Sequence, residues 1–213
     1  MATKLSVFNA ALGALGMRIL TSAQVTTPND EASRTLAEFY PAAMLYCLEQ
    51  GHWKFASKIA ELTPSVTELP TVGYTNAFAK PANYVRLNKL CTDEYFQVPL
   101  PLYDDRAGFW YADEDTIYVD YVSSEATLLG GYLAGWPETF SEYVSFYLAF
   151  KVAFKLKPDE QTRVEALAKE AKANALSKDA VLGPTVFLPP GRWTSARGGR
   201  QRSRSSNSSF YGT

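Results

Sequence analysis

Carboxylates are the side chains of this sequence whose spacing best suits chemistry. They crowd the middle of the chain at Asp104, Asp105, Asp113, Glu114, Asp115 and Asp120. A facing pair could supply the acid and the base of a glycoside hydrolase, and a larger group could bind calcium. However, residues 113–115 form a short acidic run between apolar segments, and no glycine stands where a calcium loop bends sharply. We therefore interpret this run as a solvated hairpin turn.

Sulfur and imidazole groups are scarce. The two cysteines, Cys47 and Cys91, lie in apolar surroundings and are predicted to be reduced core residues. The single histidine, His52, is expected to pack beside Trp53 at the end of a helix. No Cys/His spacing typical of zinc occurs, and neither a nucleophile elbow, a phosphate-binding loop nor a dinucleotide fingerprint is present. We predict no catalytic, metal or cofactor site, and so no enzyme.

The last thirty residues have a different chemistry from the rest. Residues 184–213 contain five arginines and no aspartate, glutamate or lysine, whereas residues 1–183 contain 16 basic and 22 acidic residues, a net charge of −6. Guanidinium groups pair with carboxylates and phosphates alike, so charge alone does not choose between a protein and a nucleic acid. Interspersed aromatic residues favour docking into the groove of a partner over a purely solubilising tail. The residues predicted to anchor this arm are Arg192, Trp193, Arg197, Arg200, Arg202, Arg204, Phe210 and Tyr211.

Apolar residues at helical spacing predict two N-terminal helices. The first carries a stripe of apolar residues at steps of three and four, namely Leu5, Phe8, Leu12, Leu15 and Ile19. It is expected to fade around Gly13 and Gly16. Asn9 interrupts the apolar run, which favours a structural helix over a signal peptide, and no segment is long and apolar enough to predict a membrane span. Thr27 and Pro28 predict the cap and first position of the second helix, which ends near Gly51.

The period of the pattern changes over residues 58–125. Ile117, Val119 and Tyr121 alternate with polar neighbours, as do Val85 and Leu87, and five prolines divide the segment into short strands. The run 109–111 and the segment from residue 116 predict a hairpin around 112–115. We expect a small antiparallel sheet or sandwich here.

Two further helices follow from residue 136. The run 140–156 is apolar almost all the way round, so its own domain or a neighbouring subunit must cover it. The alanine-rich run 159–182 has one apolar face, consisting of Val164, Leu167, Ala168, Ala171 and Ala175, and a Glu165–Lys169 pair on another. The predicted fold is therefore α+β: a helical bundle from residues 1–57 and 126–183, a β-rich insertion at 58–125 and an extended basic arm at 184–213.

The order of these segments resembles a family of virion proteins. The motifs that carry the resemblance are the Leu5 to Ile19 stripe, the helix from Glu31-Ala32 to Trp53-Lys54-Phe55-Ala56, the run Tyr74-x-x-x-Phe78-Ala79-x-Pro81-x-x-Tyr84-Val85-Arg86, and Asp120-Tyr121-Val122. Together they resemble the head-to-tail adaptors of tailed bacteriophages, in particular tail tubular protein A of short-tailed phages, over about residues 3–182. Ala82-Asn83 departs from the family pattern, which often has an acidic residue after the proline.

The resemblance implies a structural protein without catalysis. It implies a ring of twelve copies at the head–tail junction of the virion, between the portal and the tail nozzle, assembled in the host cytoplasm. DNA would pass through the ring without specific binding. We expect the arm to dock on the portal and the β-rich insertion to face the nozzle and tail fibres. Two alternatives stay open, a DNA-binding protein acting through the arm and a tail-associated glycan hydrolase using carboxylates of the insertion.

Overall fold

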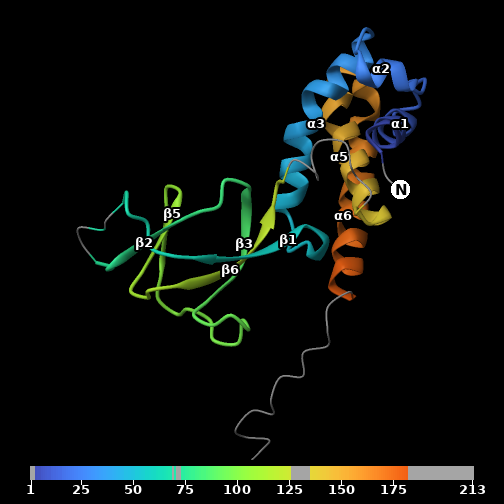
Figure 1. Ribbon diagram of the computed structural model, residues 1–213. Coiled ribbons are helices and arrows are strands. Elements are labelled where there is room, and N and C mark those ends of the chain that lie inside the picture. The colour runs from blue at the N-terminus through green and yellow to red at the C-terminus, as the bar shows by residue number, and fades with distance from the viewer. Residues whose placement is uncertain (1–2, 69, 71–72, 126–134, 182–213) are drawn as a thin grey trace, which may run out of the picture. The chain divides into compact units, whose positions relative to one another are not determined.

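The computed structural model of the protein describes residues 3–68, 70, 73–125 and 135–181. Its helices are α1 (Lys4–Ala14), α2 (Ser22–Thr26), α3 (Glu31–Glu49), α5 (Glu138–Leu156) and α6 (Gln161–Val181). Its strands are β1 (Ser57–Leu62), β2 (Asn76–Ala79), β3 (Tyr84–Cys91), β4 (Asp104–Arg106), β5 (Phe109–Ala112) and β6 (Ile117–Ser123). Helices come from both ends of this part and strands from its middle (Figure 1), so the predicted α+β class is confirmed.

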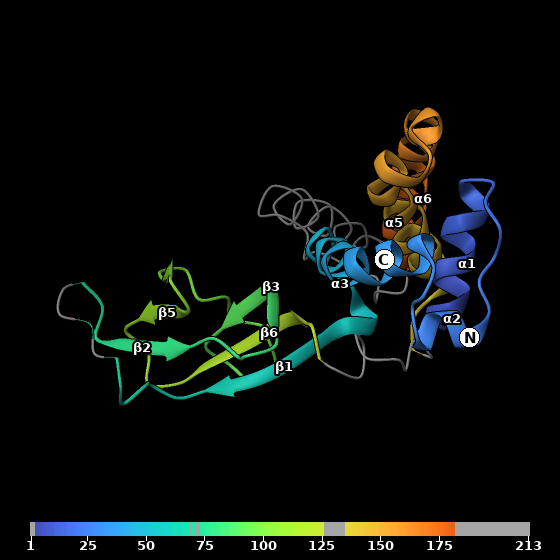
Figure 2. The same ribbon diagram turned by 90° about the horizontal axis from the view of Figure 1, so that it is seen from above.

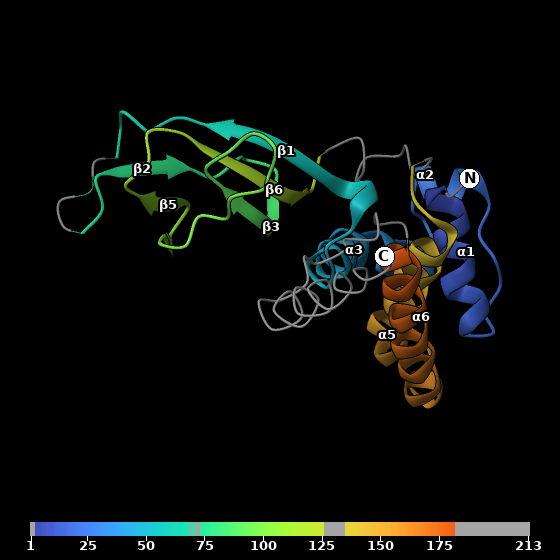
Figure 3. The same ribbon diagram turned by 90° about the horizontal axis from the view of Figure 1, so that it is seen from below.

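Helix α5 lies at the centre of the helical core. It packs against α1, α3 and α6, and Figures 2 and 3 show α6 alongside it. Phe140, Val144 and Leu148 of α5 are fully buried, as are Phe8 of α1 and Val164 of α6. Neighbouring helices thus cover most of the apolar surface of α5, while Phe154 remains 54% exposed. Among the described helices, none combines the length and apolarity that crossing a membrane requires.

A short turn of 3₁₀ helix, η2 (Pro158–Glu160), joins α5 to α6. Proline at this position cannot continue α5, because it lacks the amide hydrogen and clashes with the preceding turn. On the alanine-rich helix, Val164, Ala168, Ala171 and Ala175 are buried, as their spacing predicts, and Leu167 is half-buried. The expected ion pair is present, with 2.7 Å between Lys169 Nζ and Glu165 Oε1.

The first helix ends between Gly13 and Gly16, as predicted, and before the last residue of its apolar stripe. It ends at Ala14, and Gly16 follows with a φ of 63°, a left-handed conformation that favours glycine. Ile19 therefore lies beyond the helix and is 63% exposed, so its predicted place on the stripe is wrong. Two hydrogen bonds connect Asn9 of α1 to Leu20 in the segment after the helix. The Asn9 side chain accepts a hydrogen bond from the Leu20 amide at 2.7 Å and donates one to the Leu20 carbonyl at 3.1 Å.

The predicted start of the second long helix is wrong by three residues. Thr27 ends the short helix α2, and Asp30 is the N-cap of α3. Ser33 completes this cap, because its hydroxyl accepts a hydrogen bond from the Asp30 amide at 3.2 Å and donates one to the Asp30 carbonyl at 2.9 Å. A capping pair three residues apart satisfies backbone groups at the helix start. Pro41 lies within α3.

The strands form two three-stranded antiparallel sheets, in the orders β1-β6-β3 and β2-β5-β4. The hairpin predicted around residues 112–115 is therefore wrong, because β5 pairs with β2 and β4 while β6 pairs with β1 and β3. Contacts to the chain before and at β2 hold the connecting turn: Thr75 donates its amide to Asp113 at 2.8 Å, and Asn76 donates to the Glu114 carbonyl at 2.8 Å. The turn is thus fixed at one sheet, and the chain crosses to the other.

Side chains from both sheets share one core. Phe78, Trp110 and Ala112 come from one sheet, and Ile117 and Val119 from the other. The alternation predicted for β6 is confirmed, because Ile117, Val119 and Tyr121 are buried and Tyr118 and Asp120 are not. The alternation predicted for β3 is wrong: Leu90 and Cys91 are both buried, and Lys89 is exposed. Register shifts between Tyr84 and Arg86 and between Leu87 and Lys89 rotate successive side chains off a strict period of two.

Candidate interaction surfaces

The carboxylates of the β-rich part bind to neighbouring groups within the fold. Asp105 lies 2.5 Å from Lys80 Nζ and accepts from Trp110 Nε1 at 3.0 Å. Asp104 pairs with Arg106 at 2.5 Å. The acidic turn at 113–115 is exposed, as expected. Among the described residues, no group of three histidine, cysteine or acidic side chains lies close enough together to hold a metal ion. These contacts give Asp104 and Asp105 partners within the fold.

A polar network connects the end of α3 to the sheet β1-β6-β3. Asp120 accepts from the Ser57 hydroxyl and from Asn88 Nδ2, the latter at 3.1 Å. The Asn88 carbonyl oxygen lies 2.5 Å from His52 Nδ1, and Arg86 donates to the Glu49 carbonyl at 2.8 Å. His52 is exposed and faces this network, so the prediction that it packs beside Trp53 is wrong. The histidine contacts the amide of Asn88 and not a nucleophile, so the network serves as a structural connection.

Replacing Asp120 with alanine should lower the free energy of unfolding by about 1–3 kcal/mol. The change leaves the Ser57 hydroxyl and the Asn88 amide, both part-buried, without their shared acceptor. Urea denaturation followed by circular dichroism measures the effect. Asp115→Ala, in the exposed turn, is the control and should change stability by less than about 0.5 kcal/mol. Equal stability of the two variants would contradict the structural role of Asp120.

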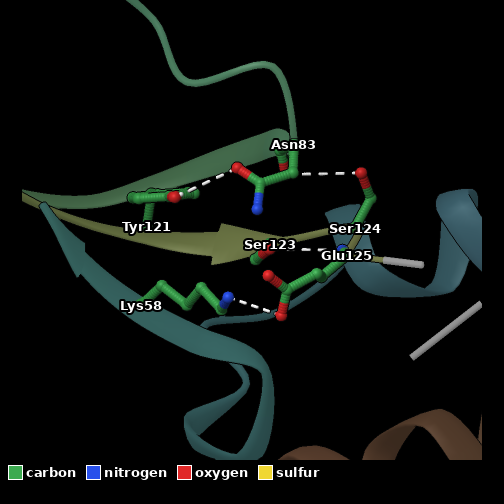
Figure 4. Close-up of polar contacts among 6 residues, drawn as sticks. All are labelled: Lys58, Asn83, Tyr121, Ser123, Ser124 and Glu125. Atoms are coloured by element: carbon green, nitrogen blue, oxygen red, sulfur yellow. Dashed lines mark hydrogen bonds and ion pairs between the residues drawn. The ribbon is translucent and has the colours of Figure 1, made fainter. Parts of the chain in front are cut away.

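A second set of polar contacts holds the end of β6 (Figure 4). Asn83 accepts from the Tyr121 hydroxyl at 3.1 Å through its side chain and from the Ser124 hydroxyl at 3.3 Å through its carbonyl. Lys58 of β1 pairs with Glu125 at 2.5 Å. The side-chain amide oxygen and the carbonyl of Asn83 thus both accept hydrogen bonds from the end of β6 and the residue after it.

An aromatic strip crosses α3 and α5. We define it as Phe39 and Tyr46 of α3 with Tyr147, Phe150 and Phe154 of α5. The rings of Tyr46 and Tyr147 stack with centroids 4.4 Å apart and an interplanar angle of 7°, and the Phe39 and Phe154 rings meet edge to face at 5.8 Å. Tyr46 is 40% exposed and Phe150 half-buried. Monomeric soluble proteins rarely expose contiguous apolar patches of large area, so this strip is a candidate protein-binding surface.

Two lysines and Glu165 line a pocket of about 240 Å³ beside this strip. Lys169 and Lys172 of α6 line the pocket together with Tyr143 and Tyr147, and Lys151 lies 5.4 Å from the centroid of the Tyr147 ring. Burial raises the pKa of the Tyr143 and Tyr147 hydroxyls above their usual range. Both hydroxyls therefore ionise only at a higher pH than an exposed tyrosine does.

A groove of about 460 Å³ runs between α1 and α5. We call it the acidic groove, and its lining residues are Ser6, Val7 and Ala10 of α1 with Glu138, Ser141, Glu142, Ser145 and Phe146 of α5. Glu138 and Glu142 are exposed and lie one helical turn apart. The groove was not predicted. Glu138 and Glu142, which are four residues apart on one helix, are the sequence signal that could have located it.

The net negative charge of residues 1–183 lies entirely in the β-rich part. Residues 58–125 contain eleven acidic and five basic residues, whereas residues 1–57 and 126–183 together contain eleven of each. Exposed apolar side chains accompany this charge on the loop between β3 and β4, at Tyr95, Val98 and Leu102. The β-rich part is therefore acidic with an apolar loop, and a partner with basic and apolar groups suits it.

Asp93 organises this loop. Its carboxylate accepts hydrogen bonds from the amides of Gln97 and Val98, the latter at 2.7 Å, and these bonds lower the pKa of Asp93. The bonds also support Phe96, whose φ of 56° lies in the left-handed region that non-glycine residues rarely adopt. The conformation of the loop thus depends on an ionised Asp93.

We expect the loop between β3 and β4 to lose the hydrogen bonds that Asp93 accepts when its carboxylate is protonated in acid. A lowered pKa in the folded state stabilises the loop above the usual aspartate pKa of about 3.9, and this contribution is lost as the pH falls through the lowered value. Amide hydrogen exchange of Gln97 and Val98, measured by NMR from neutral pH down to about pH 2 after correction for intrinsic rates, should show falling protection. Asp93→Asn should show weak protection at every pH. Unchanged protection in acid would contradict this assignment.

The predicted arm residues lie outside the described residues. These residues are Arg192, Trp193, Arg197, Arg200, Arg202, Arg204, Phe210 and Tyr211. Comparison of the chain with models of known protein families and with curated protein sequences finds no match. The surfaces of the described residues and the chemistry of the sequence are therefore the basis on which a function is proposed.

Proposed function

We propose that this protein is a structural head-to-tail adaptor of a tailed bacteriophage, which assembles as a ring between the portal and the tail nozzle. The observation that carries the proposal is the aromatic strip, because it leaves large apolar rings accessible at the surface of the helical core. Tyr46 and Phe154 are the most exposed members of the strip. Contact between such strips and neighbouring copies would bury these rings and supply free energy for assembly.

The charge distribution supports a role in which DNA passes without being held. Each copy contributes a net charge of −6 from residues 58–125, so a ring of many copies carries a strongly negative β-rich layer. Negative potential repels the phosphates of duplex DNA and weakens binding to the protein. In this proposal the basic arm, residues 184–213, makes the contact with the portal.

The mass of the native particle tests this function. Native mass spectrometry of the chain, alone and mixed with the portal protein of the same particle, should show a closed ring of about twelve copies, at the latest once the portal is present. A chain that stays monomeric with the portal would overturn the proposal. Both samples, the chain alone and the chain with the portal, are needed because a portal can act as the template on which the ring assembles.

Substitution of the strip locates the contact between copies. Tyr46→Ser combined with Phe154→Ser should reduce ring assembly at least tenfold and keep the fold, because Tyr46 is 40% and Phe154 54% exposed. Ile19→Ser is the matched control, since Ile19 is an exposed apolar residue outside the strip. Equal assembly of the control and the double variant would remove the strip from the interface.

A further inference from the structure

A ring of identical copies needs an interface in which two different surfaces of the chain meet. A surface that contacts its own equivalent on another copy closes a two-fold dimer, whereas a head-to-tail contact can continue from copy to copy round a ring. Contact between two aromatic strips would therefore give a dimer. In the proposed ring, the strip must meet a different surface of the next copy.

Exposed apolar side chains outside the strip gather between β3 and β4, in a segment that we call the β3–β4 loop (residues 92–103). Tyr95, Val98 and Leu102 are each more than half exposed. The loop also contains Asp93 and Glu94 and no basic residue, so its net charge is −2. It thus offers apolar groups together with negative charge. The loop and the strip are both exposed in one chain, so each is free to contact another copy.

The conformation of the β3–β4 loop is fixed before any partner binds. Asp93 accepts hydrogen bonds from two amides of the loop, and Phe96 has a φ of 56°. Backbone conformations of this kind persist only where the surroundings hold them, and they cluster at binding and active sites. The Glu94 carboxylate interacts with the Tyr95 hydroxyl and raises the pKa of Tyr95. An exposed ring and a negative charge therefore stand side by side on a loop that loses little conformational entropy on binding.

The pocket beside the aromatic strip has the opposite charge. Two lysines and one glutamate line it, which gives the lining a net charge of +1. Lys169 pairs with Glu165 at 2.7 Å, and Lys172 donates to Gln50 Oε1 at 2.7 Å. An ammonium group has three donors, so both lysines keep donors for another acceptor. The volume of about 240 Å³ is below the range of about 300–1,000 Å³ that is usual for small-molecule sites, so the pocket suits one protruding side chain.

On the basis of the proposed function, we propose that the β3–β4 loop of one copy binds the aromatic strip and its pocket on the next copy. Tyr95 enters the pocket, and its ring meets the exposed ring of Tyr46. Glu94 pairs with Lys169 and Lys172. The contact joins unlike surfaces with opposite charge, so it is specific in orientation and can repeat from copy to copy.

Substitutions in the loop test this contact. Tyr95→Ser combined with Val98→Ser should reduce assembly of the full chain at least tenfold, measured by native mass spectrometry with and without the portal protein. Both side chains are exposed, so the fold should remain, which circular dichroism checks. Ile59→Ser with Val66→Ser is the matched control, because it removes two exposed apolar residues of the β-rich part outside the loop. Equal assembly of the two double variants would overturn the proposal.

Mixing two variants tests whether the loop and the strip contact each other directly. Tyr46→Ser with Phe154→Ser leaves the loop intact, and the loop variant leaves the strip intact. Each variant alone should stay largely monomeric, whereas an equimolar mixture should form a heterodimer, because one intact strip then meets one intact loop. Labelling one variant with heavy nitrogen identifies the heterodimer by its mass. A mixture that contains only monomers would overturn the contact.

An exchange of charges tests the ion pairing. Glu94→Lys should weaken assembly, and adding Lys172→Glu to the same chain should restore part of it, because the two charges then have opposite signs again. Absence of any restoration in a folded chain would overturn the pairing of Glu94 with the pocket.

The outcomes separate this contact from the adaptor function. A wild-type ring with an equally good ring of the loop variant would overturn the contact and leave the adaptor function standing. A heterodimer in the mixture, combined with a wild-type chain that forms no closed ring on the portal, would support the contact and overturn the adaptor function.

Discussion

Replacing Trp53 with alanine should lower the free energy of unfolding by about 3–5 kcal/mol, the largest effect that we expect from a single substitution. Trp53 is only 1% exposed, and its ring lies 4.8 Å from that of Phe140, centroid to centroid. Its indole nitrogen donates to the Cys47 carbonyl at 3.0 Å. The substitution removes these aromatic contacts, creates a cavity beneath α5 and leaves the Cys47 carbonyl without the indole donor.

Urea denaturation followed by circular dichroism measures this loss. Trp53→Phe should cost less than Trp53→Ala, because it retains a ring and loses mainly the hydrogen bond and part of the volume. Tyr95→Ala is the control, since Tyr95 is an aromatic residue that is 74% exposed, and its removal should change stability by less than about 0.5 kcal/mol. A loss below about 1 kcal/mol for Trp53→Ala would contradict the central position of this residue.

Deleting residues 184–213 should abolish attachment to the portal and leave the rest of the chain folded. The described residues of both cores all lie before residue 182, so the truncated chain keeps this described packing. It loses five arginines, Trp193, Phe210 and Tyr211, which are the groups proposed to contact the partner. A pull-down with the portal protein of the same particle measures attachment, and circular dichroism checks the fold.

Undiminished binding by the truncated chain would contradict the role of the arm at the portal. The deletion also tests the DNA-binding alternative. If the arm binds nucleic acid, the full chain should retain duplex DNA with an affinity that falls with salt, by a log–log slope of about −0.9 per phosphate contact, and the truncated chain should not. DNA retention combined with undiminished portal binding would favour that alternative over the adaptor contact.

Most helices of this fold could be predicted from local patterns. The spacing of Val164, Ala168, Ala171 and Ala175 marks the buried face of α6, and Pro158 marks the break before it. Alternation likewise identified β6. These predictions succeeded because the side chains that determine them belong to one segment and repeat with its period.

The positions where prediction failed depend on contacts between segments. The paired hydrogen bonds between Asn9 and Leu20 join α1 to a segment eleven residues further along the chain. The start of α3 is an exception, because Ser33, only three residues after Asp30, completes its cap. The turn after β5 looks like a hairpin in the sequence, but Thr75 and Asn76 hold it beside β2. No periodic pattern within one segment reports such pairings.

The α+β class, the helical faces and the contrast in charge between residues 1–183 and 184–213 follow from local sequence patterns. The pairing of strands into sheets, the stacking of Tyr46 on Tyr147 in the aromatic strip and the lining of the acidic groove depend on contacts between distant segments. The physical reason is that periodicity and net charge are sums over neighbouring residues. A groove or a sheet arises from segments far apart in the chain, whose contacts must together offset the entropy of bringing them into place.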